Sequence, residues 1–160
     1  MYKLIDGKET AKIIKAEVKE EVSKLKETYE KVPGLAVVIV GDDPASKVYV
    51  NSKVKSCEEL GIYSEKHVMP ADVSEQELLD LVNKLNNDEK IHGILVQLPL
   101  PKGLNSKLII DSIAKEKDVD GFHGENIGKV RIGEEDTFKS CTPYGVVELL
   151  KRYNLPISGQ

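Results

Sequence analysis

Cysteine is scarce in this sequence. Cys57 and Cys141 lie far apart, and neither has a partner in a CxxC pair. A disulfide framework or a zinc cluster needs more cysteines at closer spacing, so we expect two reduced thiols in an intracellular protein. The cytoplasm is the expected location.

Long apolar runs, basic blocks and clustered histidines are also missing. The run Leu35–Val40 is far too short to span a bilayer, and Met1 is not followed by a signal peptide. The net charge is −4, with lysines and glutamates intermixed, which argues against nucleic acid or a membrane as a partner. His67, His92 and His123 lack the spacing of metal ligands, so we expect no metal.

The composition is that of a folded globular protein. The chain has 160 residues, of which 40% are hydrophobic and 31% are charged. This length suits one domain with a real core, so we assign residues 1–160 to a single domain. Its closing stretch NLPISGQ, residues 154–160, is typical of a linker toward a further element.

Helical and extended patterns alternate along the chain. The runs LAVVIV and GILVQL are typical of strands that are covered on both faces. Asp43 before Pro44, and Ser74 with Glu77, are N-cap patterns that mark the starts of two helices. The expected order is helix 8–30, strand 35–40, helix 44–60, strand 63–69, a helix after Ser74 that includes Leu85, strand 93–98, helix 106–114, an extended segment 117–120 and a helix that starts after Pro143 and runs to about 153.

This alternation predicts the fold class. Strands that alternate with helices form βαβ units, whose strands run parallel and whose helices cover both faces of the sheet. We therefore expect a three-layer α/β/α domain with a mostly parallel sheet of about four strands. A glycine-rich strand–turn–helix of the dinucleotide-binding kind is missing from the sequence.

Polar side chains follow the ends of these strands. The helix after the first strand carries Tyr49 and Lys53 one turn apart, Gln97 ends the run GILVQ, and Asp118 and Asp120 end the extended segment. Ligands of open parallel sheets bind outside the carboxyl ends of the strands. We therefore expect Lys53, Gln97 and Asp120 to converge.

Each of these residues also has an ordinary explanation by itself. A lysine on a helix is usually solvated, and a tyrosine at the margin between a helix and a sheet usually packs in the core with its hydroxyl in water. A glutamine at the end of a strand often hydrogen-bonds a backbone group, and an aspartate before a glycine often belongs to a turn. Only their joint placement favours a site. A lysine partly withdrawn from water is a general acid and base, a tyrosine stacks on a flat ring, and a carboxylate accepts from ring N–H groups. The set suits a planar, nitrogen-rich substrate.

A rival interpretation starts from Asp42 and Asp43. Two acidic residues after the first strand are also found in the phospho-acceptor pocket of response-regulator receivers. That pocket needs an aspartate at the end of the third strand, where this chain has Gln97. Helix capping explains Asp43 better.

Four sequence blocks carry a family resemblance. VGDDPASKVYVNSKVKSCEELGI, GILVQLPLP, KDVDGFHGENIGKV and CTPYGVVELL occur in this order. The chain resembles the methylenetetrahydrofolate dehydrogenase/methenyltetrahydrofolate cyclohydrolase family (FolD-type) from about Asp6 to its last residue. The resemblance implies an oxidoreductase and hydrolase of one-carbon metabolism and purine biosynthesis. Such an enzyme oxidises 5,10-methylenetetrahydrofolate with NADP (or NAD) and hydrolyses the methenyl product to 10-formyltetrahydrofolate.

The resemblance also implies roles for individual residues. Lys53 matches the catalytic proton-transfer lysine, Gln97 the glutamine that tunes it, Tyr49 the tyrosine that packs on the folate, and Asp120 the aspartate that binds the pterin. Catalysis is thus expected from Lys53, Gln97 and Tyr49. The expected substrate-binding residues are Tyr49, Lys53, Val96, Gln97, Leu98, Pro99 and Asp120.

The chain departs from the family pattern in two respects. Ser140 stands where the family usually has a proline, and the family continues after the position of Gln160 into a Rossmann domain with the dinucleotide site. We therefore expect no cofactor-binding residues and no hydride transfer in this chain, and a homodimer only for the full-length protein. The alternatives are a non-catalytic folate-binding or assembly module, and an amino-acid or shikimate dehydrogenase with a similar first domain. The Tyr49–Lys53 pair, together with QLPLP from Gln97, favours the folate enzyme over these dehydrogenases.

Overall fold

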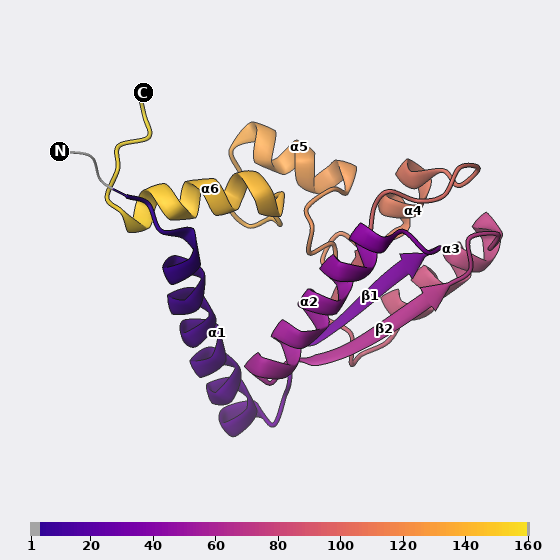
Figure 1. Ribbon diagram of the computed structural model, residues 1–160, viewed down its shortest axis with the longest axis horizontal. Coiled ribbons are helices and arrows are strands. Elements are labelled where there is room, and N and C mark those ends of the chain that lie inside the picture. Colours follow the sequence, from indigo (N-terminus) through magenta and orange to yellow (C-terminus); the bar gives the residue numbers. More distant parts are fainter. Residues whose placement is uncertain (1–3, 160) are drawn as a thin grey trace.

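The computed structural model of the protein describes residues 4–159. It contains a parallel three-stranded sheet, which lies beside α2 and α3 and apart from α1 and α6 (Figure 1). The strands are β1 (Gly34–Val40), β2 (Tyr63–Met69) and β3 (Gly93–Val96), in the order β2-β1-β3. In register, Val37 of β1 lies beside Lys66 of β2 and Leu95 of β3. The predicted domain limits, residues 1 and 160, lie outside the described residues.

Helices precede, separate and follow these strands. The order agrees with the predicted alternation of helices and strands, so the two connections between the strands are helical crossovers. The helices are α1 (Gly7–Tyr29), α2 (Pro44–Leu60), α3 (Glu75–Asn86), α4 (Ser106–Ser112), α5 (Gly124–Ile132) and α6 (Cys141–Arg152).

The two faces of the sheet bury different side chains, because successive residues of a strand point to opposite sides. On one face, Val50 of α2 packs against Val37, Ile39 and Leu95. On the other face, α3 and α4 build a larger core on the alternate strand residues, which includes Leu78 of α3. The predicted three-layer α/β/α architecture is confirmed.

Local signals in the sequence fix the ends of α2 and α3. The Asp43 carboxylate accepts a hydrogen bond from Ser46 N at 2.7 Å, and Gly61 ends α2 in the left-handed conformation with φ +77°. Ser74 and Glu77 form the predicted capping box of α3. These caps set where α2, and therefore Lys53, lies over the sheet.

The prediction of a fourth strand at residues 117–120 is wrong. Within residues 4–159, the segment 117–120 makes only an isolated bridge, between Asp118 and Ile94 of β3, with Ile94 N donating to Lys117 O at 2.7 Å. Gly93 permits this approach, since a Cβ there would lie 2.5 Å from Val119 Cγ1. The pairing stops because the chain turns at Gly121, whose φ is +66°.

The C-terminal part also differs from the prediction. Helix α5 was not predicted, because its glycines (Gly124 and Gly128) and exposed apolar residues give no clear helical stripe. Helix α6 was predicted to start after Pro143, but it begins at Cys141. Proline is tolerated in the first turn of a helix, where an amide has no intrahelical partner.

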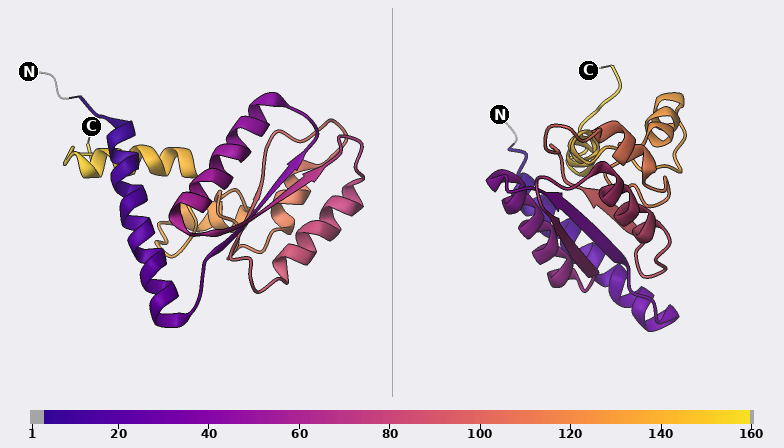
Figure 2. Two further views of the ribbon diagram at one scale, coloured as in Figure 1. Left: turned by 60° about the horizontal axis from the view of Figure 1, so that its bottom comes forward. Right: turned by 90° about the vertical axis from the view of Figure 1, so that its right-hand side faces the viewer.

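Helices α1 and α6 extend away from the sheet and meet near the ends of the described chain (Figures 1 and 2). The Arg152 guanidinium joins them through bonds of 2.8 and 2.6 Å to the Glu17 carboxylate. On the predicted apolar stripe of α1, Val22 is buried but Leu25 and Tyr29 are exposed. No helix of the described part is long and apolar enough to cross a membrane.

Candidate active site

A cavity of about 870 Å³ lies on the α2 face of the sheet. Its size is within the range of small-molecule sites. It runs from the first residues of the strands, Gly34 and Gly93, to Gln97 and Leu98 beyond the end of β3. The sequence predicts a site at the carboxyl edge of the sheet. The cavity includes this edge but also extends across the face of the sheet.

Lys53 and Gln97 meet at this cavity. Lys53 Nζ donates to Gln97 Oε1 at 3.2 Å, and Gln97 Nε2 donates to the Leu98 carbonyl at 2.8 Å. The second bond determines which end of the amide faces the lysine. The Gln97 main chain is held as well, since its N–H donates to Val38 O at 2.8 Å. The amine is thus oriented by a neutral partner.

Asp120 provides the acidic group of the site. Burial raises the pKa of its carboxyl above the ordinary value of 3.8, which the positive charge of Lys53 and a hydrogen bond from Cys141 partly oppose, while Asp118 adds to the rise. A half-buried carboxylate is only partly solvated, so a ligand N–H group would be a favourable partner.

Cys141 is a site residue that the sequence analysis missed. Its Sγ lies 3.4 Å from Val119 O and 3.7 Å from Asp120 Oδ1. The residue as a whole is exposed, but burial of the thiol against this loop, together with the Asp120 charge, raises the pKa of Cys141. Only its place in the CTPYG block signalled it.

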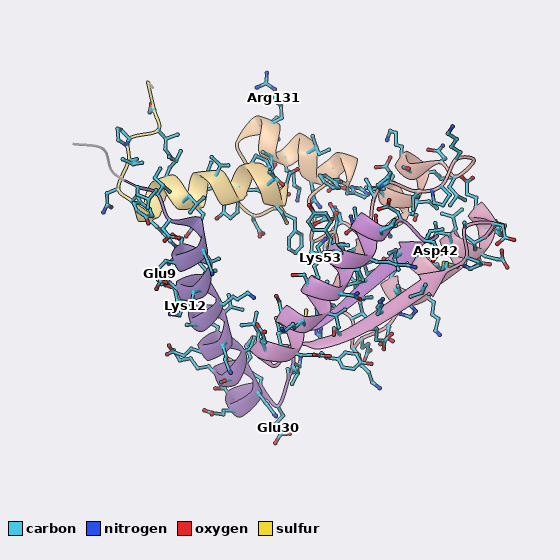
Figure 3. All side chains as sticks on the ribbon, viewed as in Figure 1. Glu9, Lys12, Glu30, Asp42, Lys53 and Arg131 are labelled. Atoms are coloured by element: carbon cyan, nitrogen blue, oxygen red, sulfur yellow. The ribbon has the colours of Figure 1, made fainter. Side chains whose placement is uncertain are left out.

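The structure brings together some of the predicted residues. Lys53, Gln97, Leu98 and Asp120 all line the cavity, and Figure 3 shows Lys53 on the side of α2 that faces the first turn of α6. Further lining residues that sequence reasoning did not single out include Cys57, His92, Phe122, Thr142 and Pro143.

Three predicted residues lie outside the cavity lining. Tyr49 is 63% exposed, one turn before Lys53 on α2. The Val96 side chain belongs to the core on the opposite face of the sheet, so only its main chain could meet a ligand in this cavity. Pro99 follows Leu98 through a cis peptide bond. The roles of these residues, and those of the lining residues, stay predictions.

The β1–α2 junction does not fit a dinucleotide. A pyrophosphate binds at a helix N-terminus through free amides, but here the Asp43 carboxylate already accepts from Ser46 N. Asp42 adds a second acid, paired with Lys47 at 2.7 Å, at the end of α2 away from Lys53 (Figure 3). Among the described side chains, no three His, Cys, Asp or Glu gather as a metal site requires.

The fold and site define a general class. A three-layer α/β domain in which an oriented lysine and a half-buried carboxylate line one largely apolar cavity is suited to bind a small polar heterocycle and to transfer protons to it.

Residues 5–120 match the family model described as "Tetrahydrofolate dehydrogenase/cyclohydrolase, catalytic domain". The chain belongs to this family. It is 51% identical over 160 residues to the bifunctional protein FolD of Geotalea daltonii, covering 100% of this chain and 56% of that protein. It is 54% identical over 157 residues to the protein of the same name from Bacillus cereus, covering 98% of this chain and 54% of that protein. The chain thus spans about half the length of these relatives.

Solved structures agree with this assignment. The FolD enzyme of Campylobacter jejuni superposes with a TM-score of 0.93 at 48% identity, over 96% of this chain and 54% of that one. The Trypanosoma brucei FolD, which was solved with NADP and an inhibitor, gives 0.94 at 35% identity, over 99% and 54%. Both are methylenetetrahydrofolate dehydrogenase–cyclohydrolases by name.

Proposed function

We propose that residues 1–160 form the folate-binding, catalytic domain of a bifunctional one-carbon enzyme. The complete enzyme oxidises 5,10-methylenetetrahydrofolate to the 5,10-methenyl compound with NADP or NAD, and hydrolyses that product to 10-formyltetrahydrofolate. The observation that carries this proposal is the 3.2 Å bond between Lys53 Nζ and Gln97 Oε1, made in the cavity that Asp120 also lines.

The hydrolytic step needs a group that moves protons. Water adds through its oxygen to the methenyl carbon and loses one proton, which leaves a hydroxyl on this carbon. The bond from the carbon to N5 then breaks, N5 takes up a proton, and the hydroxyl releases its remaining proton to solvent as its oxygen becomes the formyl carbonyl. The neutral form of Lys53 accepts the first proton and its charged form supplies the second. Gln97 orients the amine without adding charge.

The other residues bind and hold the substrate in this proposal. The Asp120 carboxylate accepts from the N–H groups of the pterin, and Tyr49 packs on the folate. Leu98 and Pro99 border the pterin, and Val96 contributes its main chain. These assignments are supported by the shared cavity of Lys53, Gln97, Leu98 and Asp120 and by the family resemblance.

Hydride transfer is assigned to the longer protein. A bound dinucleotide supplies the hydride acceptor, but the β1–α2 junction presents acidic groups at the place where a pyrophosphate would bind. We therefore expect the chain of residues 1–160 to catalyse hydrolysis without oxidation. For the full-length protein we propose a homodimer in the cytoplasm, which sedimentation of that protein and its location in cells would test.

The test is an absorbance assay of 5,10-methenyltetrahydrofolate hydrolysis without nucleotide. Lys53→Met should reduce turnover at least about 100-fold, the lower range of general acid–base catalysis. Lys55→Met, which changes an exposed lysine of the same helix, should keep the parental rate. An equal rate in Lys53→Met would refute the role of Lys53. Folate binding without turnover by the folded parent would instead favour a non-catalytic folate-binding module.

A further inference from the structure

The hydroxyl of Ser140 does not cap the helix that it precedes. Ser140 is the N-cap residue of α6, yet its side chain makes no capping hydrogen bond. Ser140 Oγ instead donates to the Gly121 carbonyl at 3.2 Å. An N-cap serine normally accepts from an amide of the first turn, so this hydroxyl serves a contact between two segments rather than the helix itself.

The two segments are also in close contact through their backbones. A Cβ on Gly121 would lie 2.6 Å from Lys139 C and 2.7 Å from Ser140 N. The left-handed φ of Gly121 is a second reason for glycine at this position. Cys141 Sγ contacts Val119 O and Asp120 Oδ1 in the same region. The start of α6 therefore contacts each of residues 119, 120 and 121.

The loop of residues 118–123 also has hydrogen bonds centred on Asp118 that do not involve Ser140. The Asp118 carboxylate accepts from His123 N at 2.8 Å and from Asn126 Nδ2 at 2.9 Å, and Gly121 N donates to Asp118 O at 3.2 Å. These bonds hold Asp118 and the amides of residues 121 and 123, and none of them involves the Gly121 carbonyl. The Gly121 carbonyl, directly after Asp120, is held by Ser140 at the start of α6.

We propose that Ser140 is a positioning residue for Asp120. Its hydroxyl ties the Gly121 carbonyl to the start of α6 and so keeps the Asp120 carboxyl in the cavity, on the side of Lys53. The inference rests on the proposed function, in which Asp120 binds the pterin. Proline, usual at this position in the family, fixes φ near −65°; Ser140 has φ −53°, so it keeps that backbone shape and holds the loop by a hydrogen bond instead.

The charged and titratable groups around Asp120 provide a readout that does not depend on catalysis. Lys53 from α2, Cys141 from α6 and Asp118 from the same segment act on its carboxyl, and burial raises its pKa. If the loop loosens, water reaches the carboxyl and the pKa moves back toward its ordinary value. The titration of the Asp120 carboxyl carbon, followed by ¹³C NMR, reports this directly.

Four substitutions make the test specific. Ser140→Ala and Ser140→Val should lower the pKa of Asp120 and weaken tetrahydrofolate binding roughly 2- to 10-fold, the range that one hydrogen bond spans. Ser140→Thr has nearly the shape of the valine variant but keeps the hydroxyl. It should therefore keep the parental pKa of Asp120 and the parental affinity for tetrahydrofolate. Ser74→Ala removes a genuine helix cap on α3, and should lower the melting temperature without changing either readout.

The outcomes separate this inference from the proposed function. An Asp120 titration that is the same in Ser140→Val and Ser140→Thr would overturn the role of Ser140, whatever the folate affinity. Failure of the parent chain to bind tetrahydrofolate would overturn the proposed function, while the titration would still decide whether Ser140 positions Asp120.

Discussion

Asp120 shows a conflict between binding and stability at the level of one residue. In the proposed function its carboxyl stays in the cavity to bind the pterin, but burial raises its pKa and disfavours the charged form. A carboxyl with a raised pKa in the folded state binds its proton more tightly there than in the unfolded chain. Its contribution to stability therefore falls as the pH rises from the ordinary value of 3.8 through the raised value.

Asp120→Asn tests this conflict, because asparagine keeps an acceptor oxygen but does not ionise. The variant should melt at a higher temperature than the parent at pH 7, and the difference should shrink as the pH falls toward 3.8. Tetrahydrofolate binding should weaken at the same time. Thermal unfolding across this pH range checks the first result, with the exposed Asp72 changed to Asn as the control. A lower melting temperature for Asp120→Asn at pH 7 would contradict the argument.

The sequence predicted some of the site residues for reasons that are local. Lys53 follows a capped helix start by a fixed number of turns, and Gln97 directly follows a buried strand, so both positions are set by nearby residues. Ser140 and Cys141 could not be found in this way. Their contacts to residues 119–121 depend on where α6 packs, which no local pattern determines.

At the level of elements, the faces of the sheet have separate tasks. Helix α3 covers the face with the larger core, and Leu78 is fully buried there, whereas the cavity lies on the α2 face. Local patterns placed both helices correctly, because caps and periodicity agreed. The prediction of a fourth strand was wrong because a strand forms only where it pairs with a partner, and the turn at Gly121 ends the pairing after one bridge.

The separation of faces predicts that stability and binding respond independently. Leu78→Ala should lower the free energy of unfolding by about 2–5 kcal/mol, the cost of a large-to-small change in a core. Its tetrahydrofolate affinity, measured where the variant is folded, should stay within about twofold of the parent's, since additivity holds for distant sites. Urea unfolding and a binding titration check this. Leu108→Ala, at a leucine of α4 that is 42% exposed, should cost clearly less, and a large loss of affinity in Leu78→Ala would show that the two faces are coupled.

For the whole molecule, the notable feature is apolar surface on the last two helices. Ile132 is 74% exposed, Val146 53% and Ile127 52%. Side chains of these helices also line a small apolar cavity of about 250 Å³ between α5 and α6. Exposed apolar groups gathered on neighbouring elements favour association, whereas single ones are ordinary.

We therefore expect residues 1–160 to self-associate as the concentration rises, through the surface of α5 and α6. Ile132→Glu places a charge on this surface and should shift the weight-average mass from sedimentation equilibrium toward 17.7 kDa, the mass of one chain. Tyr29→Glu changes an equally prominent side chain, 66% exposed near the end of α1, and should have little effect on association. Self-association that is unchanged by Ile132→Glu but abolished by Tyr29→Glu would show that the chains associate through α1 instead. Leu25 and Tyr29, on the predicted apolar stripe of that helix, are exposed.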